Sequence, residues 1–463
     1  MPLIKMEFSP LTQISECFIK PKHEVEESKQ PYHLSPFDIL LLSGHYLQKG
    51  LLFTKPKQDV LSISSSIDKL LESLKHSLAL TLVHFYPLAG QLNTIVDNDH
   101  GRSLVYVDCN KGPGVRFVHA TLDNTTSDII SPPRVPAAVN TFFDHSHGEV
   151  NYDGHTRPLL SIQVTELIDG IFIGCSMNHA IVDGTSFWHF WNVWSDIHRA
   201  NNAVITRLPI HKRWFPDGYS SKDMYLPFID HKEFIYRYDP PQLVGRFFHF
   251  SLETITNLKA RANEEIGNTN KVSSFQALIA FVWRSIIQAK GLNPNQLTHC
   301  KLAANNRTRL EPPLPEEYFG NLLSILVSTT TVGELLEQSF GKTALSLRQL
   351  VVNHTNKDVH NFAHSWFKSP FSARFDRLLV KEPNSTLHVG SSPRFNIYGN
   401  EFAGIGKPIA VRSGVANKFD GKLNLYPGNE GGGSVDVEIC LPCDSMRALE
   451  ANEDFMAVVS SPK

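Results

Sequence analysis

The residues with the clearest chemical potential in this sequence are His179 and Asp183, which form a His-x-x-x-Asp pair. A neutral imidazole can take a proton from a hydroxyl or amine, and a nearby carboxylate can orient the ring or hold its loop. The spacing alone is weak, because about one such pair is expected by chance among 21 histidines. Two further pairs, His119–Asp123 and His354–Asp358, share this spacing.

The sequence around His179 separates it from the other two histidines. It follows the apolar run 171–177, which predicts a buried strand, whereas His354 lies in a polar run and His119 precedes polar residues. Gly184 is expected to take a positive φ in a turn, with Thr185 capping the helix that follows. Burying a histidine costs free energy unless its polar atoms are used. The context leaves two interpretations open, a general base and a satisfied core histidine.

Other motifs in the chain give no support to alternative chemistry. The runs 339–346 and 403–408 each lack the first glycine of a phosphate-binding loop, and neither a G-x-G-x-x-G after a strand nor a G-x-S-x-G is present. His145 and His147 form a His-x-His without further ligands, so we predict a surface loop and no metal site. Cys440 and Cys443 form a single C-x-x-C, and we expect all six cysteines to be free thiols.

The elements that must position these residues alternate between strand-like and helix-like runs, which indicates an α/β fold. The predicted helices are 66–80, 253–265 and 273–288, and the predicted strands are 103–108, 115–119, 159–167, 171–177, 246–251, 323–331, 395–398, 422–426 and 434–440. Prolines punctuate 201–241, which we interpret as a long crossover. The predicted division is 1–200, 201–241 and 242–463.

Composition excludes several classes of protein. The 463 residues carry 44 Lys plus Arg and 46 Asp plus Glu, a net charge of −2 that argues against a nucleic-acid or anionic membrane partner. With 41% hydrophobic residues the chain can bury a large core. Neither a run long enough to span a bilayer nor a signal-peptide core is evident. We therefore expect a cytoplasmic monomer that does not associate with membranes.

Several segments, taken together and in order, resemble the plant BAHD family of CoA-dependent acyltransferases, in its acetyltransferase-like subgroup. They are YPLAGQL at 86–92, NHAIVDG at 178–184, NNRTRLEPPLPEEYFGN at 305–321, GIGKP at 404–408, KFDGK at 418–422 and EGGGSVD at 430–436. The resemblance implies two chloramphenicol-acetyltransferase-like domains, each a mixed sheet flanked by helices, with a channel between them. It also implies acyl transfer from a CoA thioester to a hydroxyl or amine of a small specialised metabolite.

The resemblance also assigns roles to residues. His179 would be the general base in the channel, and Asp183 would hold the loop through a salt bridge rather than touch the imidazole. Acyl-CoA would be a co-substrate, with no tightly bound cofactor.

The resemblance places further residues at the two substrates. Ser273, Ser274 and Lys259 would lie near CoA, Asn321 would face the channel and contact CoA there, and Pro36 would line the pocket. A helix cap for Ser273 and a solvated side chain for Lys259 remain open alternatives.

The segment 401–408 departs from the Asp-Phe-Gly-Trp-Gly-Lys-Pro signature of the family. Glu401 stands for the aspartate, Ile405 stands for the tryptophan, and Ala403 is an insertion. Gly404 and Gly406 keep the glycine pattern of the loop.

Arg307 or Arg309 is the expected partner of Glu401. Because the altered segment would weaken CoA docking, a lyase or cyclase that uses the His179 pocket without CoA stays open. A non-catalytic binding protein of the same fold is a second alternative, and the intact His179 and Asp183 argue against it.

Overall fold

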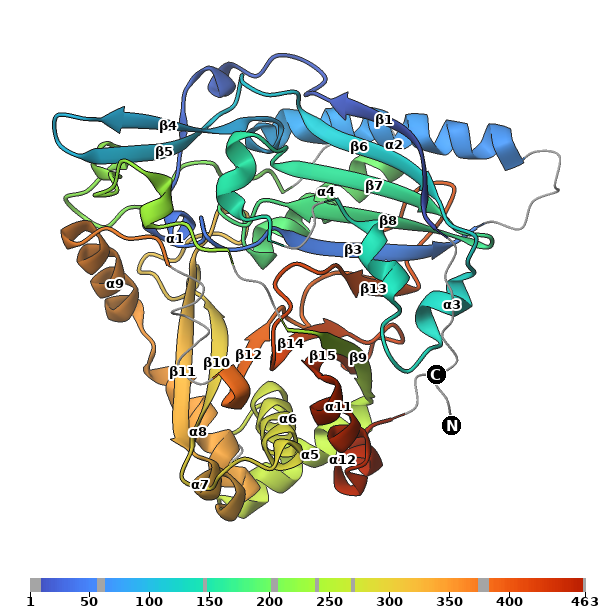
Figure 1. Ribbon diagram of the computed structural model, residues 1–463, viewed down its shortest axis with the longest axis vertical. Helices are drawn as coiled ribbons and strands as arrows, with labels where there is room; N and C mark the ends of the chain where they lie inside the picture. Colours follow the sequence, from blue (N-terminus) through green and yellow to red (C-terminus); the bar gives the residue numbers. More distant parts are fainter. Residues whose placement is uncertain are drawn as a thin grey trace.

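The computed structural model describes residues 10–55, 63–144, 148–200, 207–237, 241–267, 271–373 and 383–460. Two six-stranded mixed sheets dominate the fold, and the second lies beneath the β3–β13 edge of the first (Figure 1). The first sheet has the order β1 (Thr12–Ile19), β6 (Val115–Thr121), β7 (Leu160–Glu166), β8 (Gly170–Met177), β3 (Leu47–Thr54) and β13 (Ala410–Ser413). The second has the order β11 (Leu323–Thr331), β10 (Leu297–Asn305), β12 (Thr386–Gly390), β14 (Lys422–Pro427), β15 (Val435–Pro442) and β9 (Leu243–Phe250).

A small third sheet and the helices complete the architecture. The third sheet joins β2 (Tyr32–His33), β5 (Arg102–Asp108) and β4 (Gln91–Asp97). The helices are α1 (Pro36–Ile39), α2 (Ile63–His84), α3 (Thr126–Ile130), α4 (Gly184–Ala200), α5 (Leu252–Glu265), α6 (Ser274–Lys290), α7 (Val332–Glu337), α8 (Phe340–Asn353), α9 (Asn356–Lys368), α11 (Cys443–Glu450) and α12 (Glu453–Val458). None of the helices in the described ranges combines the length and the apolar character needed to cross a bilayer.

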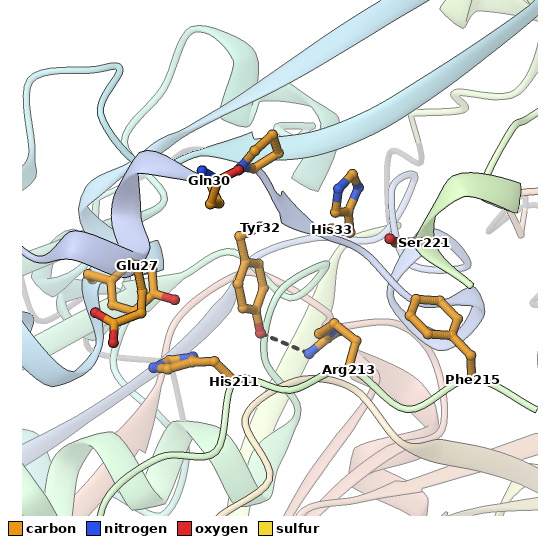
Figure 2. A pocket seen from close by; sticks show the side chains of 10 residues that line it. Glu27, Gln30, Tyr32, His33, His211, Arg213, Phe215 and Ser221 are labelled. Carbon is orange, nitrogen blue, oxygen red and sulfur yellow. Dashed lines mark hydrogen bonds between the residues drawn. The ribbon is translucent and has the colours of Figure 1, made fainter.

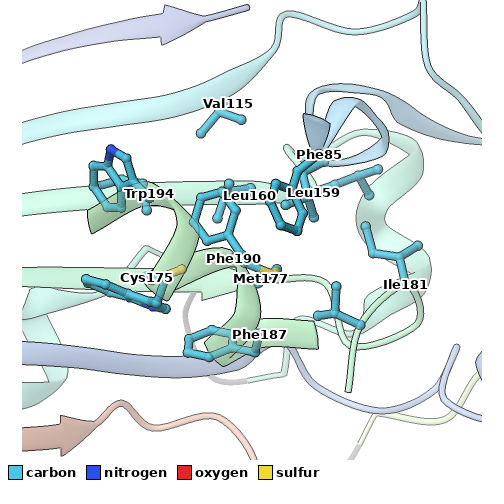
Figure 3. Close-up of a cluster of buried hydrophobic side chains, with 14 of the residues drawn as sticks. Phe85, Val115, Leu159, Leu160, Cys175, Met177, Ile181, Phe187, Phe190 and Trp194 are labelled. Atoms are coloured by element: carbon cyan, nitrogen blue, oxygen red, sulfur yellow. The ribbon is translucent and has the colours of Figure 1, made fainter. Parts of the chain in front are cut away.

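The hairpin β7–β8 and the helix α4 bring the His179 segment into the core of the first sheet. Both strands are buried along almost their whole length, and they pair in antiparallel fashion. Phe187, Phe190 and Trp194 of α4 lie against Cys175 and Met177 of β8 (Figure 3). The apolar spacing of α4 therefore fixes its first turn, and the loop before it, at the end of β8.

The second sheet buries one face against helices α5, α6, α8 and α11. On β14, Leu423 and Leu425 belong to this core. Because side chains alternate along a strand, Lys422, Asn424 and Tyr426 point to the opposite face. That polar face is turned toward the first sheet (Figure 1).

One strand from the C-terminal part of the chain joins the first sheet. Strand β13 pairs in antiparallel fashion with β3, with Val411 opposite Leu51. The predicted division at 1–200, 201–241 and 242–463 stays a prediction, and β13 shows that backbone pairing crosses between the two halves.

The sequence predicted most of the paired strands but missed several. Residues 395–398 form no strand, so that prediction was wrong: Phe395 and its neighbours make turns whose contacts go to α4 instead. Strands β1, β2, β3, β4, β10, β12 and β13 were not predicted. Most of these carry polar or irregular patterns, and their pairing depends on neighbours distant in the sequence.

Candidate active site

The backbone around His179 is fixed by hydrogen bonds to a buried asparagine. The Oδ1 of Asn151 accepts a hydrogen bond from the backbone N–H of His179 at 2.8 Å. The backbone carbonyl of Asn151 accepts a hydrogen bond from the side-chain Nδ2 of Asn178 at 2.7 Å. Asn178 in turn accepts the Ala180 N–H at 3.0 Å. The strand therefore ends in a rigid turn rather than a mobile loop.

The His179 ring has one nitrogen engaged and one available. Its Nδ1 lies 2.8 Å from the carbonyl oxygen of Val182, which can only accept, so we assign the proton to Nδ1. Within the described ranges no residue hydrogen-bonds to Nε2, and the side chain is only partly buried. Nε2 is thus a lone-pair acceptor that a substrate can reach.

Desolvation is the main influence on the protonation of His179. Burial lowers its pKa below the ordinary value of 6.5, and the positive charge of Lys422 lowers this pKa as well. The carbonyl of Val182 and the charge of Asp183 act in the opposite direction. The imidazole is therefore neutral near pH 7, which is the form that a general base requires.

Asp183 does not hydrogen-bond to the imidazole but forms a bidentate ion pair with Arg307. The Arg307 nitrogens lie 2.6 and 3.0 Å from its two oxygens, and both side chains are completely buried. The Arg307 guanidinium also donates to the backbone carbonyls of Tyr318 and Gly320, both at 2.9 Å. This pair joins the loop after β8 to the segment 305–321 of the other half.

Asp183 also caps helix α4, which corrects two expectations. Its Oδ1 accepts the backbone N–H of Ser186 at 3.0 Å. The helix begins at Gly184, so Thr185 is not the cap, and Gly184 does not have a positive φ. A Cβ at Gly184 would lie 3.2 Å from the ring of Phe395, so close packing is what favours glycine there.

Asn321 connects the His179 turn to helix α1. Its Nδ2 donates to the backbone carbonyl of His179 at 2.7 Å and to Asp38 at 3.0 Å. Asp38 is completely buried and forms an ion pair with Arg213. Pro36 begins α1 and is buried two residues before Asp38. Neither Asp38 nor Arg213 was predicted, although Asp38 stands only two residues after Pro36, which the resemblance placed at the pocket.

Arg213 also lines a cavity beside this network. The cavity has a volume of about 270 Å³, and its walls include Tyr32, His33, His211 and Arg213 (Figure 2). Arg213 donates to the Tyr32 hydroxyl at 2.8 Å. The wall of the cavity is therefore linked to the His179 backbone through Arg213, Asp38 and Asn321.

The segment 401–408 packs on the far part of α4. Phe402 and Gly406 exchange backbone hydrogen bonds of 3.0 and 2.8 Å around a turn formed by 403–405. Gly404 and Gly406 have φ of 89° and 74°, which explains the glycines. The centroid of the Phe402 ring lies 5.1 Å from that of Trp194, which is about 15 Å along α4 from the start of the helix at Gly184.

Glu401 has a different partner from the expected one. Arg307 pairs with Asp183, and Arg309 donates to the backbone carbonyls of Val351 and His354. The carboxylate of Glu401 instead lies 3.8 Å from Arg199, and both side chains are largely exposed. The prediction of Arg307 or Arg309 was therefore wrong, because the tertiary fold places α4 rather than the 305–321 segment beside this loop.

Comparisons with known proteins assign the family. The family model Transferase family matches residues 9–456. An uncharacterized acetyltransferase of Arabidopsis thaliana is 37% identical over 450 residues, which cover 96% of this chain and 98% of the relative. BAHD acyltransferase DCR of the same plant is 34% identical and covers 96% and 92%. The chain is a BAHD acyltransferase.

Solved structures confirm the predicted fold of this BAHD acyltransferase. Vinorine synthase superposes with a TM-score of 0.74 at 23% identity, covering 98% of this chain and 99% of that one. TRI101 of F. sporotrichioides, complexed with coenzyme A and T-2, superposes with a TM-score of 0.71 at 18% identity, covering 92% and 98%. The prediction of two sheet-containing domains of this acyltransferase fold is thus confirmed.

The three residues predicted near CoA, which are Ser273, Ser274 and Lys259, lie on the helical side of the second sheet and not at the His179 turn. Ser273 caps α6, where its hydroxyl accepts the Gln276 N–H at 3.3 Å, and Ser274 is the exposed first residue of that helix. Lys259 is a partly exposed residue of α5. Both helices cover the face of the second sheet turned away from the first (Figure 1). A role in CoA binding stays a prediction for all three.

The remaining motifs have structural partners. His119 lies 2.7 Å from Glu166, and His354 lies 2.9 Å from Asn306, so neither histidine contacts the aspartate four residues on. His145 and His147 fall outside the described residues. Across the parts of the chain that are described, no cluster of three or more potential metal ligands occurs. Cys440 and Cys443 are free thiols.

Proposed function

We propose that His179 is the general base of this acyltransferase, which moves an acyl group from a CoA thioester to a hydroxyl or amine of a small metabolite. The observation that carries the proposal is the Nδ1 contact to the Val182 carbonyl, which leaves Nε2 unprotonated and partly accessible. The lowered pKa keeps the ring neutral, and a buried turn holds it in place. The substrates reach it through a channel between the halves.

The proposed reaction balances without a covalent enzyme intermediate. Nε2 takes the proton of the acceptor hydroxyl or amine while its oxygen or nitrogen attacks the thioester carbonyl carbon. The tetrahedral intermediate collapses as the carbon–sulfur bond breaks, and the imidazolium returns the proton to the departing thiolate. The products are an ester or amide and free CoA. General-base catalysis of this kind contributes about 10²–10⁴-fold.

We assign positioning roles to Asp183, Arg307 and Asn321. The ion pair fixes the turn between His179 and α4 to the other half of the molecule. Asn321 holds the His179 carbonyl, and since both of its donor contacts are internal, its amide is committed to the protein. Its Oδ1 is buried and accepts no hydrogen bond from a described residue. This arrangement favours positioning over the predicted CoA contact.

The acceptor can be an alcohol or an amine. Relatives of this chain include shikimate O-hydroxycinnamoyltransferase of Nicotiana tabacum and agmatine coumaroyltransferase-1 of Hordeum vulgare, each 30% identical. Their names cover both classes of acceptor. We also propose a cytoplasmic monomer, which fractionation and light scattering will test.

A panel of acyl-CoA thioesters tests the proposal. A productive donor at about a hundredfold over its Kd should stabilise the protein by about 2.7 kcal/mol in thermal unfolding. Mass spectrometry should then detect an acylated acceptor with wild type and lose it with His179→Ala, while donor binding persists. Turnover of a substrate without any CoA ester would support the lyase or cyclase alternative instead.

A further inference from the structure

A cluster of lysines lies between the two sheets, on the polar face of the second. Lys422 begins β14, and Lys418 precedes it in the same segment. Lys49 reaches the cluster from β3 of the first sheet, with its ammonium 2.8 Å from the hydroxyl of Tyr426. Glu438 of β15 is the carboxylate at the centre of the group and is completely buried.

Glu438 is already neutralised by its own contacts. Lys418 forms an ion pair with it at 3.1 Å. Ser413 donates to its two oxygens at 2.8 and 2.6 Å, and Asn424 and Tyr426 donate at 3.1 and 3.3 Å. The charge of Glu438 is thus matched by Lys418, and its lone pairs are engaged. Two ammonium groups, those of Lys49 and Lys422, remain without a carboxylate of their own.

Of these two lysines, Lys49 donates a hydrogen bond to Tyr426, whereas the ammonium of Lys422 is available to a ligand. Its Nζ lies 5.5 Å from the ring centroid of Phe419, and no described residue supplies it with a hydrogen bond or an ion pair. Gly390 leaves space for the ammonium of Lys422, because a Cβ at this position would lie 2.6 Å from its Nζ. The side chain is only partly buried, so a small molecule can contact it.

The positive charges of Lys49 and Lys422 are only partly balanced by negative charge nearby. Burial lowers the pKa of Lys49 to about 7 and that of Lys422 to about 8, and the charges of Glu438 and Cys440 act in the opposite direction on both. A buried ammonium without an anion is unfavourable, and an incoming anion restores the balance. The position matters as much as the charge. Lys422 lies on the face of the second sheet that is turned toward the first, whose strand β8 ends just before His179 (Figure 1). Its positive charge also lowers the pKa of the His179 imidazole.

We propose that Lys422, supported by Lys49, forms a subsite for a carboxylate carried by the acyl acceptor. This inference rests on the proposed function, since it places the subsite beside the general base. CoA is the less suitable source of the anion, because its phosphates are separated from the thioester by the whole pantetheine arm. A group bound beside the base must belong to the part of the substrates that reacts. The substrate class is therefore a hydroxy acid or an amino acid.

Matched acid and ester acceptors test the subsite. The probes are shikimate and anthranilate against their methyl esters, with the acyl donor that gives the highest turnover. A charge-assisted hydrogen bond predicts that kcat/KM for the acids exceeds that for the esters by about tenfold or more. Lys422→Gln should bring this ratio close to one, and Lys422→Arg should preserve it. Lys342→Gln, an exposed lysine of α8, is the control and should keep the wild-type ratio.

Two results overturn the subsite. One is equal use of acids and esters by wild type. The other is a loss in Lys422→Gln that falls equally on acid and ester, which would mean that the ammonium acts on a step common to both.

Failure of the proposed function looks different from failure of the subsite. It would appear as no transfer from any acyl-CoA, with wild type and His179→Ala alike. In that event calorimetry with shikimate, anthranilate and their methyl esters decides whether the subsite exists, because binding can be measured without turnover. Tighter binding of the acids than of the esters, lost in Lys422→Gln, supports it, and equal binding overturns it.

Discussion

The two oxygens of Asp183 lie 2.6 and 3.0 Å from the guanidinium nitrogens of Arg307, with neither side chain exposed to solvent. This pair connects the turn that carries His179 to a segment more than a hundred residues later in the chain. Asp183 of the His-x-x-x-Asp pair is therefore bound to Arg307 rather than to the imidazole. We expect its substitution to lower the free energy of unfolding and to affect catalysis only through the folded fraction.

Asp183→Asn should destabilise the protein. The substitution leaves the Arg307 charge buried and unpaired, which costs about 3–5 kcal/mol. Chemical denaturation and soluble yield measure the effect, and activity should fall with the folded fraction. A mutant of full stability that has lost its activity would mean that Asp183 orients the imidazole directly.

His179→Ala should fold like wild type and lose turnover by about 10²–10⁴-fold. The side chain is partly exposed, so little packing is lost with it. The controls are His119→Ala and His354→Ala, whose rings contact Glu166 and Asn306. We expect both controls to keep the wild-type kcat, and an active His179→Ala enzyme with an unchanged melting curve would sink the assignment.

The pH profile of kcat/KM should have its acid limb below pH 6.5. Burial and the charge of Lys422 lower the pKa of His179 from 6.5, so the active neutral form persists to lower pH than for an exposed imidazole. Asp183 acts in the opposite direction and moderates the shift. Removing the positive charge in Lys422→Gln should raise this pKa and move the limb toward higher pH. An acid limb that moves toward lower pH in Lys422→Gln would contradict the effect of the Lys422 charge on His179.

Asn321→Ala should reduce kcat more than it changes KM for acyl-CoA. The substitution removes the hydrogen bonds to the His179 carbonyl and to Asp38, each worth about 1 kcal/mol. The turn that holds the imidazole then loses its support from the other half of the molecule. Asn424→Ala, which contacts Glu438 instead, serves as the comparison. A selective rise in KM for acyl-CoA would favour the CoA contact that the sequence predicted.

Phe402→Ala should destabilise the protein by about 3–5 kcal/mol, because the ring is completely buried against Trp191 and Trp194 of α4. Phe371→Ala is the matched control, since that ring is 43% exposed. The difference in unfolding free energy between the two variants measures how strongly the segment 401–408 anchors the halves. A near-neutral Phe402→Ala would show that the segment does not anchor them.

Much of the candidate site could be predicted from the sequence, because its parts are local. A buried strand, a turn and an apolar helix follow one another within 171–200, and their periodicities indicate both the elements and the position of His179. The same holds for 86–92 and 305–321, whose order supported the family resemblance. That Asp183 would pair with an arginine could be proposed, but the identity of the arginine could not.

The partners were decided by the tertiary structure. Arg307 or Arg309 was expected to pair with Glu401, yet the fold brings Arg307 to Asp183 and leaves Glu401 beside Arg199. Asp38 and Asn321 are 283 residues apart in the sequence and hydrogen-bond to each other. The hydrogen bond from Lys49 to Tyr426 of β14 depends on the strand β3, which the sequence pattern did not predict.

By itself, the sequence determined the α/β fold, the turn that presents His179, and the family, because these depend on local periodicity and on ordered runs of residues. The tertiary structure alone decided which charges are balanced. A lysine is compensated or left uncompensated according to which strands pair and how far apart the sheets lie. That geometry arises from long-range packing, and it leaves Lys422 between the two sheets without a carboxylate of its own.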